Sequence, residues 1–194
     1  MKRIVTIIFY VVLAGCAKVE LISDKKTPLP VTSPTALEIP VLKPIVVKID
    51  LNQRQKKYLE ESLPSNVREI LEKSEKFEVL KEVIGKENSE RELMTFEPNR
   101  TAKITIEKDK KEILEAFFYD AAREDSPAAC YEPHHAIRAA FQNKTVEIEI
   151  CFSCSRFEVK SEYGNFSGTI TRKNPKSEKF LDRIITAQGI EFKN

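Results

Sequence analysis

The chain has 194 residues, of which 32% are charged and 41% hydrophobic, and this balance is typical of a folded globule with a well-solvated surface. Lys and Arg number 32 against 30 Asp and Glu, and Trp is absent. Because nucleic-acid binding needs a surplus of positive charge along the phosphates, we exclude nucleic acid as the expected partner.

The N-terminal residues have the organisation of a secretory signal. Lys2 and Arg3 give a positive start, residues 4–14 form an uncharged apolar run, and small residues precede Cys16. The run is too short to cross a bilayer as a helix, which takes about 20 apolar residues. We therefore expect residues 1–15 to be a signal peptide.

The sequence Leu13-Ala14-Gly15-Cys16 resembles the lipobox of bacterial lipoproteins. The resemblance implies that the thiol of Cys16 receives diacylglycerol and that cleavage frees its amino group for a further acyl chain. Two or more chains make a stable anchor, whereas one holds a protein only weakly. Ala17 is not the aspartate with which this family often retains lipoproteins in the inner membrane, so we expect a cell-envelope location in the outer membrane. The alternative is an ordinary cleaved signal with an incidental cysteine.

A proline-rich stretch follows the anchor. Five of the ten prolines lie between residues 17 and 44. Proline removes a backbone donor and favours extended chain, so we expect residues 16–44 to be a lipidated, semi-rigid tether. Residues 45–194 are then a single globular domain.

The domain is expected to open with a strand and two helices. A β-branched run predicts a strand over 45–49. Asn52 and Gln55 form a capping-box pair that opens a short helix ending near residue 63.

A longer amphipathic helix is predicted over 66–84. Asn66 and Glu69 form a second capping-box pair, apolar residues recur behind it at helical spacing, and Gly85 supplies a stop. We expect the apolar face of this helix to pack on the core, although a helix that fills a partner's groove has the same pattern.

Three further elements follow along the chain. Alternating apolar residues predict a half-buried strand over 101–106. An apolar stripe predicts a helix over 109–123, opened by a capping-box pair at Asp109 and Glu112. Asn174-Pro175 is an N-cap followed by a proline at the first helical position, which predicts a helix over 175–188 with Gly189 as its stop.

Possible chemistry is concentrated between residues 130 and 154, which hold both histidines and all three cysteines other than Cys16. Two alternating strands here predict a hairpin with a two-residue loop at Asn143-Lys144. That register sets Phe141 opposite Val146 on one face and Arg138 opposite Glu149 on the other. It also sets Cys151 opposite Ala136 and returns the cysteines beside the histidines.

Three interpretations of the cysteines remain open. Cys130, His134, Cys151 and Cys154 are the ligand types of a tetrahedral zinc site with three cysteines and one histidine. Alternate strand residues face opposite sides, so such a site requires the chain to turn after Cys151. In an oxidising compartment, a disulfide from Cys130 to Cys151 or Cys154 is the rival, and buried free thiols are the third possibility. A thioredoxin-like role is disfavoured because that chemistry places the first thiol at a helix N-terminus.

The pattern Cys-x-x-x-His-His-Ala-Ile-Arg, followed by Ile-Cys-Phe-x-Cys, resembles a segment of small uncharacterised bacterial proteins, many of them exported. The resemblance covers about 25 residues and implies a shared hairpin without an activity to carry over.

These patterns predict an α+β fold, with a mostly antiparallel sheet covered on one face by helices at 66–84, 109–123 and 175–188. We expect a membrane-anchored lipoprotein whose domain is not an enzyme, needs no cofactor and has a protein-binding or structural role towards an envelope partner. The alternative is a zinc protein, structural or hydrolytic, built on the cysteine and histidine cluster.

Overall fold

The computed structural model describes residues 41–81 and 101–190. Helices and strands follow one another there as α1 Gln53–Ser62, α2 Ser65–Lys73, β1 Lys76–Lys81, β2 Thr101–Ile104, α3 Glu107–Ala121, β3 His135–Phe141, β4 Lys144–Cys151, β5 Arg156–Ser161, β6 Gly164–Thr169 and α4 Lys176–Ala187. None of the helices within these ranges is long and apolar enough to cross a membrane. The expected signal peptide, Cys16 and most of the tether lie outside the described residues.

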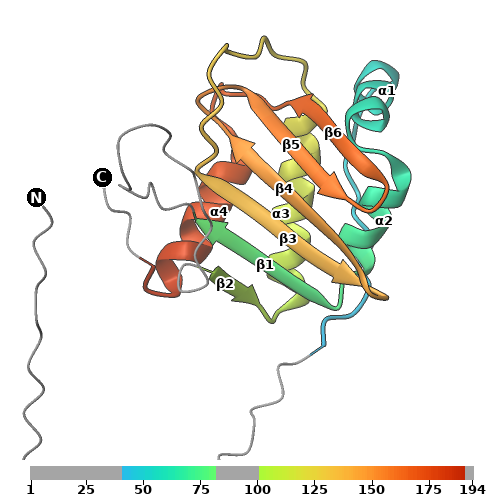
Figure 1. Cartoon of the computed structure of the whole chain (residues 1–194), viewed down its shortest axis with the longest axis vertical. Coiled ribbons are helices and arrows are strands. Elements are labelled where there is room, and N and C mark those ends of the chain that lie inside the picture. Colours follow the sequence, from blue (N-terminus) through green and yellow to red (C-terminus); the bar gives the residue numbers. More distant parts are fainter. Residues whose placement is uncertain (1–40, 82–100, 191–194) are drawn as a thin grey trace, which may run out of the picture. The chain divides into compact units, whose positions relative to one another are not determined.

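The strands form one sheet in the order β2-β1-β3-β4-β5-β6, and every neighbouring pair is antiparallel. Figure 1 shows α3 behind the strands, with α4 on one side of it and α1 and α2 on the other. Inward-facing apolar residues of the strands pack against these helices, as where the Phe117 and Phe157 rings meet edge to face at 5.4 Å. The expected α+β class is confirmed.

The apolar stripe predicted for α3 forms the centre of this core. Its buried members are Ile113, Leu114, Phe117, Phe118 and Ala121. The predicted capping box at Asp109 is wrong, because the helix begins two residues earlier, at Glu107, with Ile106 in the cap position and no side-chain cap bond.

The helix predicted over 66–84 is wrong beyond Lys73. Phe77, which fits helical spacing with the apolar residues before it, is instead a buried side chain of β1, and Val79, two residues on, is buried on the same face of the strand. Strand β1 pairs with both β2 and β3, so the chain gains a full set of ladder bonds by ending α2 early. The predicted stop at Gly85 lies outside the described residues.

The predicted strand over 45–49 is also wrong, since this stretch has no regular secondary structure. The backbone N–H of Ile45 donates to the Glu72 carbonyl at 3.0 Å, and that of Leu42 donates to the Glu75 carbonyl at 3.2 Å. These carbonyls lie at and just beyond the end of α2. Leu42 is buried in the core, so the last residues of the expected tether already pack with the domain.

The β3–β4 hairpin is present, but its register differs by two residues from the predicted one. Its loop is Gln142-Asn143, both at positive φ as a type I′ turn requires, so Phe141 pairs with Lys144 and Arg138 with Glu147. Asparagine tolerates this conformation better than lysine, which the predicted loop would place there. A shift of two residues leaves every side chain on its predicted face.

Helix α4 begins at Lys176, and its N-terminus is capped from another helix. The expected cap at Asn174 is wrong, because Pro175 holds the cap position and makes no side-chain bond. Asp120 of α3 supplies the acceptor instead: its Oδ2 accepts from the backbone N–H and the hydroxyl of Ser177, each at 2.7 Å. A carboxylate is well placed there, since the helix N-terminus carries partial positive charge.

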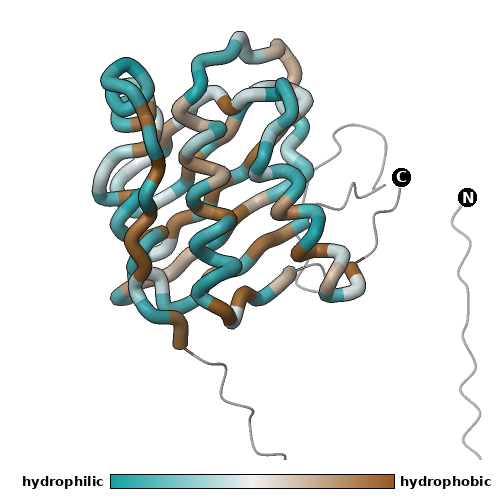
Figure 2. The backbone as a smooth tube through the Cα atoms, turned by 180° about the vertical axis from the view of Figure 1, so that it is seen from behind, coloured by the Kyte–Doolittle hydropathy of each residue, from teal (hydrophilic) through white to brown (hydrophobic). Residues whose placement is uncertain are grey.

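Polar residues gather on α1 and on the face of the sheet opposite the helices. In Figure 2, α1 is largely hydrophilic, whereas the strands carry hydrophobic and hydrophilic stretches in alternation. Side chains on the sheet face away from the helices include charged residues of β1, β3, β4 and β5, which form ion pairs between strands. An antiparallel sheet can leave one face to water in this way.

Candidate functional site: the cysteine cluster

The site is organised by the turn that joins β4 to β5. Cys151 ends β4 and Arg156 begins β5 opposite it, so residues 152–155 form a four-residue turn. The turn closes with a hydrogen bond from the Ser155 N–H to the Phe152 carbonyl at 3.2 Å, and Ser155 takes a positive φ of 53°. The required turn after Cys151 therefore forms without glycine or proline.

The turn brings Cys151 and Cys154 together as a disulfide, with their Cα atoms 5.2 Å apart. The expected bridge from Cys130 to one of them is wrong for this structure, because the compact turn satisfies disulfide geometry within itself. Both bridged cysteines are fully buried, whereas Cys130 is a free and exposed thiol.

Cys130 nevertheless lies against the bridge. Its Sγ is 3.8 Å from Sγ of Cys154. The backbone around it is fixed on both sides: the Ala128 N–H donates to the Cys154 carbonyl at 2.9 Å, and the Glu132 N–H donates to Sγ of Cys154 at 3.4 Å. The three cysteines predicted to converge are thus brought together.

Tyr131 holds the same segment onto the sheet. Its hydroxyl donates to the Glu149 carbonyl at 3.2 Å, and the Arg156 guanidinium lies over its ring at 5.0 Å. Burial raises the pKa of Tyr131, and the carboxylates of Glu158 and Glu149 raise it further, so the phenol stays protonated at any physiological pH.

The two histidines are neighbours at the start of β3 and line the same pocket. His135 is buried on the helix side, where its Nε2 lies 2.9 Å from Asp182 Oδ1 of α4 and its ring packs edge to face on Phe152. His135 Nδ1 is buried without a hydrogen-bond partner. His134, the proposed metal ligand, is partly buried, and burial lowers its pKa. Both line an open pocket of about 290 Å³ whose other lining residues are Lys81, Phe152, Ser153, Glu178 and Asp182.

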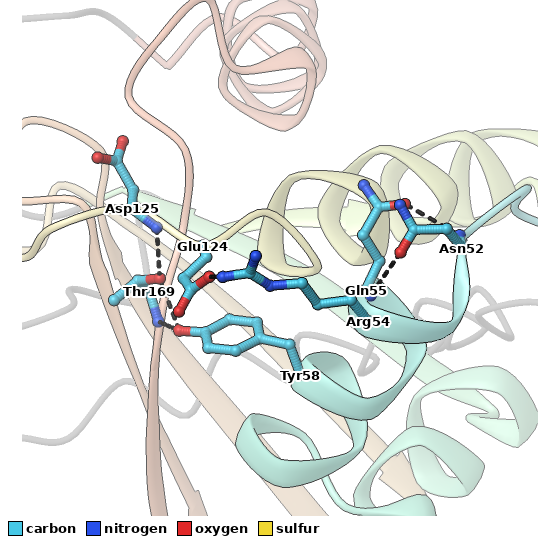
Figure 3. Close-up of polar contacts among 7 residues, drawn as sticks. All are labelled: Asn52, Arg54, Gln55, Tyr58, Glu124, Asp125 and Thr169. Carbon is cyan, nitrogen blue, oxygen red and sulfur yellow. Dashed lines mark hydrogen bonds and ion pairs between the residues drawn. The ribbon is translucent and has the colours of Figure 1, made fainter.

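A second polar network, unpredicted from the sequence, steadies the start of the segment that carries Cys130. Figure 3 shows it where α1, the end of α3 and β6 meet. The Tyr58 and Thr169 hydroxyls lie 2.7 Å apart, and the Thr169 hydroxyl accepts from the Asp125 N–H at 3.2 Å. Arg54 and Glu124 form an ion pair beside them. No sequence signal could reveal this, since Tyr58 and Thr169 are 111 residues apart.

The carboxylate of Asp125 connects this network to the cysteine turn. Its Oδ2 accepts from the Arg172 N–H at 3.2 Å and from the Ser155 hydroxyl at 3.3 Å, and its Oδ1 accepts from the Ser126 N–H at 2.8 Å. The hydrogen bond from the Arg172 N–H is the largest of several that lower the pKa of Asp125. Residues 122–134 are therefore held to the turn at Asp125 as well as at Ala128.

Zinc binding is not tested by this arrangement. Thiolates are the ligand form of cysteine, and the disulfide removes the thiolates of Cys151 and Cys154. Within residues 41–81 and 101–190, no group of three or more His, Cys, Asp or Glu is placed to hold a metal ion. The site of three cysteines and His134 stays a prediction for the reduced protein.

Comparison of the chain with models of protein families, with curated proteins and with solved structures finds no match.

Proposed function

We propose that the chain is a bacterial lipoprotein, exported by residues 1–15, anchored through acyl chains on Cys16 and directed to the outer membrane. Its domain binds another envelope protein and catalyses no reaction of its own. The lipobox supports the anchor, and Ala17 supports the outer membrane. The feature that carries the binding role is the face of the sheet opposite the helices.

This open face, defined by the charged side chains of β1, β3, β4 and β5 that point away from the helices, carries ion pairs between strands. Arg138 lies between two carboxylates, with nitrogens 2.6 Å from Glu147 Oε2 and 3.8 Å from Glu78 Oε2. Lys160 pairs with Glu149 on the next two strands. The Arg138 side chain is 40% exposed, so the network is fixed in place yet accessible.

A network of this kind suits a polar protein partner. Charged side chains already held by neighbours lose less rotamer freedom on binding, which lowers the cost of association. Alternating fixed charges favour a partner with the complementary pattern and repel others, so they give specificity more than raw affinity. We therefore expect binding at this face to weaken as salt is added.

The anchor is tested by metabolic labelling of the full chain in bacteria with an alkyne analogue of palmitate. We expect the wild-type protein to carry the label, the Cys16→Ser variant to lack it, and the matched Cys130→Ser variant to keep it. An unlabelled wild-type chain, or a labelled Cys16→Ser variant, would contradict the proposed anchor.

The binding face is tested by photocrosslinking in intact cells. A photoreactive residue replaces Glu158 on the open face or, as a control, the exposed Lys57 of α1. We expect a discrete crosslinked species from position 158 that disappears when Arg138→Glu is added, and none from position 57. The same species from both positions, or one insensitive to Arg138→Glu, would count against the open face.

A further inference from the structure

The three sulfur atoms form a contiguous group with one exposed member. Sγ of Cys130 is in van der Waals contact with Sγ of Cys154, at 3.8 Å, while Cys154 is bonded to Cys151. Cys151 and Cys154 are fully buried, and Cys130 is exposed. Disulfide exchange proceeds by attack of a thiolate on a disulfide sulfur, so Cys130 already occupies the place of an attacking group.

Each sulfur that would leave in such an exchange has hydrogen-bond donors. Sγ of Cys151 accepts from the Cys154 N–H at 3.2 Å and lies 3.4 Å from the Ser153 hydroxyl. Sγ of Cys154 accepts from the Glu132 N–H at 3.4 Å. Donors aimed at a sulfur favour its thiolate form, which makes it a better leaving group.

We propose that Cys130, Cys151 and Cys154 form a thiol–disulfide exchange site for a free thiol. Cys130 first loses its proton to solvent, and its thiolate attacks Sγ of Cys154. The Cys130–Cys154 bond forms, the Cys151–Cys154 bond breaks, and the electron pair leaves on Cys151, which takes a proton from solvent. No net oxidation or reduction occurs.

The rearrangement moves a buried disulfide to the surface. In the Cys130–Cys154 form, one bonded sulfur belongs to the exposed residue Cys130, where an external thiolate can approach it. Its attack forms a mixed disulfide with Cys130, and Cys154 departs as a thiolate beside the Glu132 N–H. The external thiol is thereby oxidised to the level of a disulfide and the protein disulfide is opened. Each molecule exchanges its disulfide once in these steps, so the exchange is not a catalysed turnover. It goes beyond partner binding and does not depend on the anchor.

The deciding measurement is the rate at which glutathione opens the disulfide of the full chain in detergent. Alkylation and mass spectrometry report the free thiols over time. Because the bridge is buried, we expect the rate in the Cys130→Ser variant to fall at least about tenfold below wild type. The neighbouring Ala129→Ser variant, as a control for the loop, should react like wild type. Equal rates in wild type and Cys130→Ser would overturn the proposal.

A second variant tests the geometry directly. In Cys151→Ser, exposure to oxidised glutathione should link Cys130 to Cys154. Trypsin then gives a clear readout, because Cys130 lies in the peptide 124–138 and Cys154 in the peptide 145–156. A crosslink between these peptides supports the exchange. Two separate glutathione adducts, or two thiols that stay free, would overturn it.

The source of the thiol is distinguished by offering two probes to the wild-type chain. Glutathione represents a small thiol, and an unfolded polypeptide with one reduced cysteine represents a protein thiol. The faster mixed disulfide at Cys130 identifies the class of substrate. A chain that forms an adduct with neither probe would overturn the second step.

Discussion

Lys110 is a fully buried cation that joins α3 to the end of α2. Its Nζ donates to the carbonyls of Glu72 and Ser74, at 2.8 and 2.9 Å. The last carbonyls of a helix lack partners within the helix, and a lysine there also opposes the negative end of the helix dipole. We expect Lys110→Met to lower the free energy of unfolding by about 1–3 kcal/mol in urea denaturation, because the buried Ser74 carbonyl would lose its donor, whereas the Glu72 carbonyl would keep the Ile45 N–H.

The same residue predicts a pH dependence. Burial lowers the pKa of Lys110 to about 8, against an ordinary value of 10.5 in the unfolded chain. Between these values the unfolded state binds more protons than the folded state, so the contribution of Lys110 to stability rises with pH across this window. The stability difference between wild type and Lys110→Met should therefore be larger at pH 9.5 than at pH 7. A Cys130→Ser background for both chains avoids thiol exchange at high pH.

The neighbouring Lys111 provides the control. It is partly exposed and pairs with Glu115 on the helix surface, so Lys111→Met should change stability by less than about 0.5 kcal/mol. Equal losses in Lys110→Met and Lys111→Met, or a difference that shrinks towards pH 9.5, would show that the buried amine does not act as proposed.

For individual residues, the sequence predicts contacts between close neighbours in the chain and misses contacts between residues far apart in it. The capping box of Asn52 and Gln55 is confirmed, because both partners lie within one turn and each satisfies the other's backbone. The carbonyl partners of Lys110 are 38 and 36 residues away, so no spacing rule could find them. The cap on α4 from Asp120 was missed for the same reason.

Among the elements, the segment of residues 122–134 has no regular secondary structure yet places Cys130 against the disulfide. Asp125 attaches its N-terminal part to the rest of the domain through Arg172 and Ser155. We expect Asp125→Ala to speed hydrogen exchange at the Ser126 and Arg172 amides, since both lose their acceptor. Hydrogen–deuterium exchange with mass spectrometry of the full chain measures this.

The adjacent Glu124 supplies a matched comparison. Its only described polar contact is the ion pair with Arg54, and both side chains are more than half exposed. Exposed pairs contribute little to stability, so Glu124→Ala should leave exchange in this segment close to wild type. Similar exchange in wild type and Asp125→Ala would mean that the carboxylate does not restrain the segment.

Two of the predicted elements fail because local pattern and tertiary pairing compete. The stretch over 66–84 contains apolar residues at both helical and alternating spacing, and β1 forms because the edges of β2 and β3 are available to it. The stretch over 45–49 has strand-like composition, but the Ile45 N–H donates to the Glu72 carbonyl at the end of α2 instead of to a strand edge. The apolar stripes of α3 and α4 do not also fit strand spacing next to an available strand edge. The ends of these two helices are therefore predicted to within a few residues.

For the whole molecule, one-sided coverage of the sheet was predictable because it follows from alternation along the strands. The concentration of cysteines and histidines likewise located the candidate site. The disulfide pairing of the cysteines was not predictable. It depends on a four-residue turn with Ser155 at positive φ, and on the Asp125 carboxylate, which is distant in sequence and attaches residues 122–134 to that turn. The sequence pattern predicts which face of a strand or helix a side chain occupies. Which two of three nearby sulfurs are bonded depends on tertiary contacts.

We propose that the destination of the molecule depends on Ala17, the side chain next to the proposed anchor. The lipoprotein resemblance implies that aspartate after the lipidated cysteine retains the protein in the inner membrane, and this chain has Ala17 there. We expect Ala17→Asp to move the full-length protein from outer-membrane to inner-membrane fractions on a sucrose gradient, without changing palmitate labelling at Cys16. Ala17→Ser, which adds a polar group without charge, should stay in the outer membrane. A wild-type chain already in the inner membrane would refute the proposed location, and an unmoved Ala17→Asp variant would show that residues further along the tether decide it.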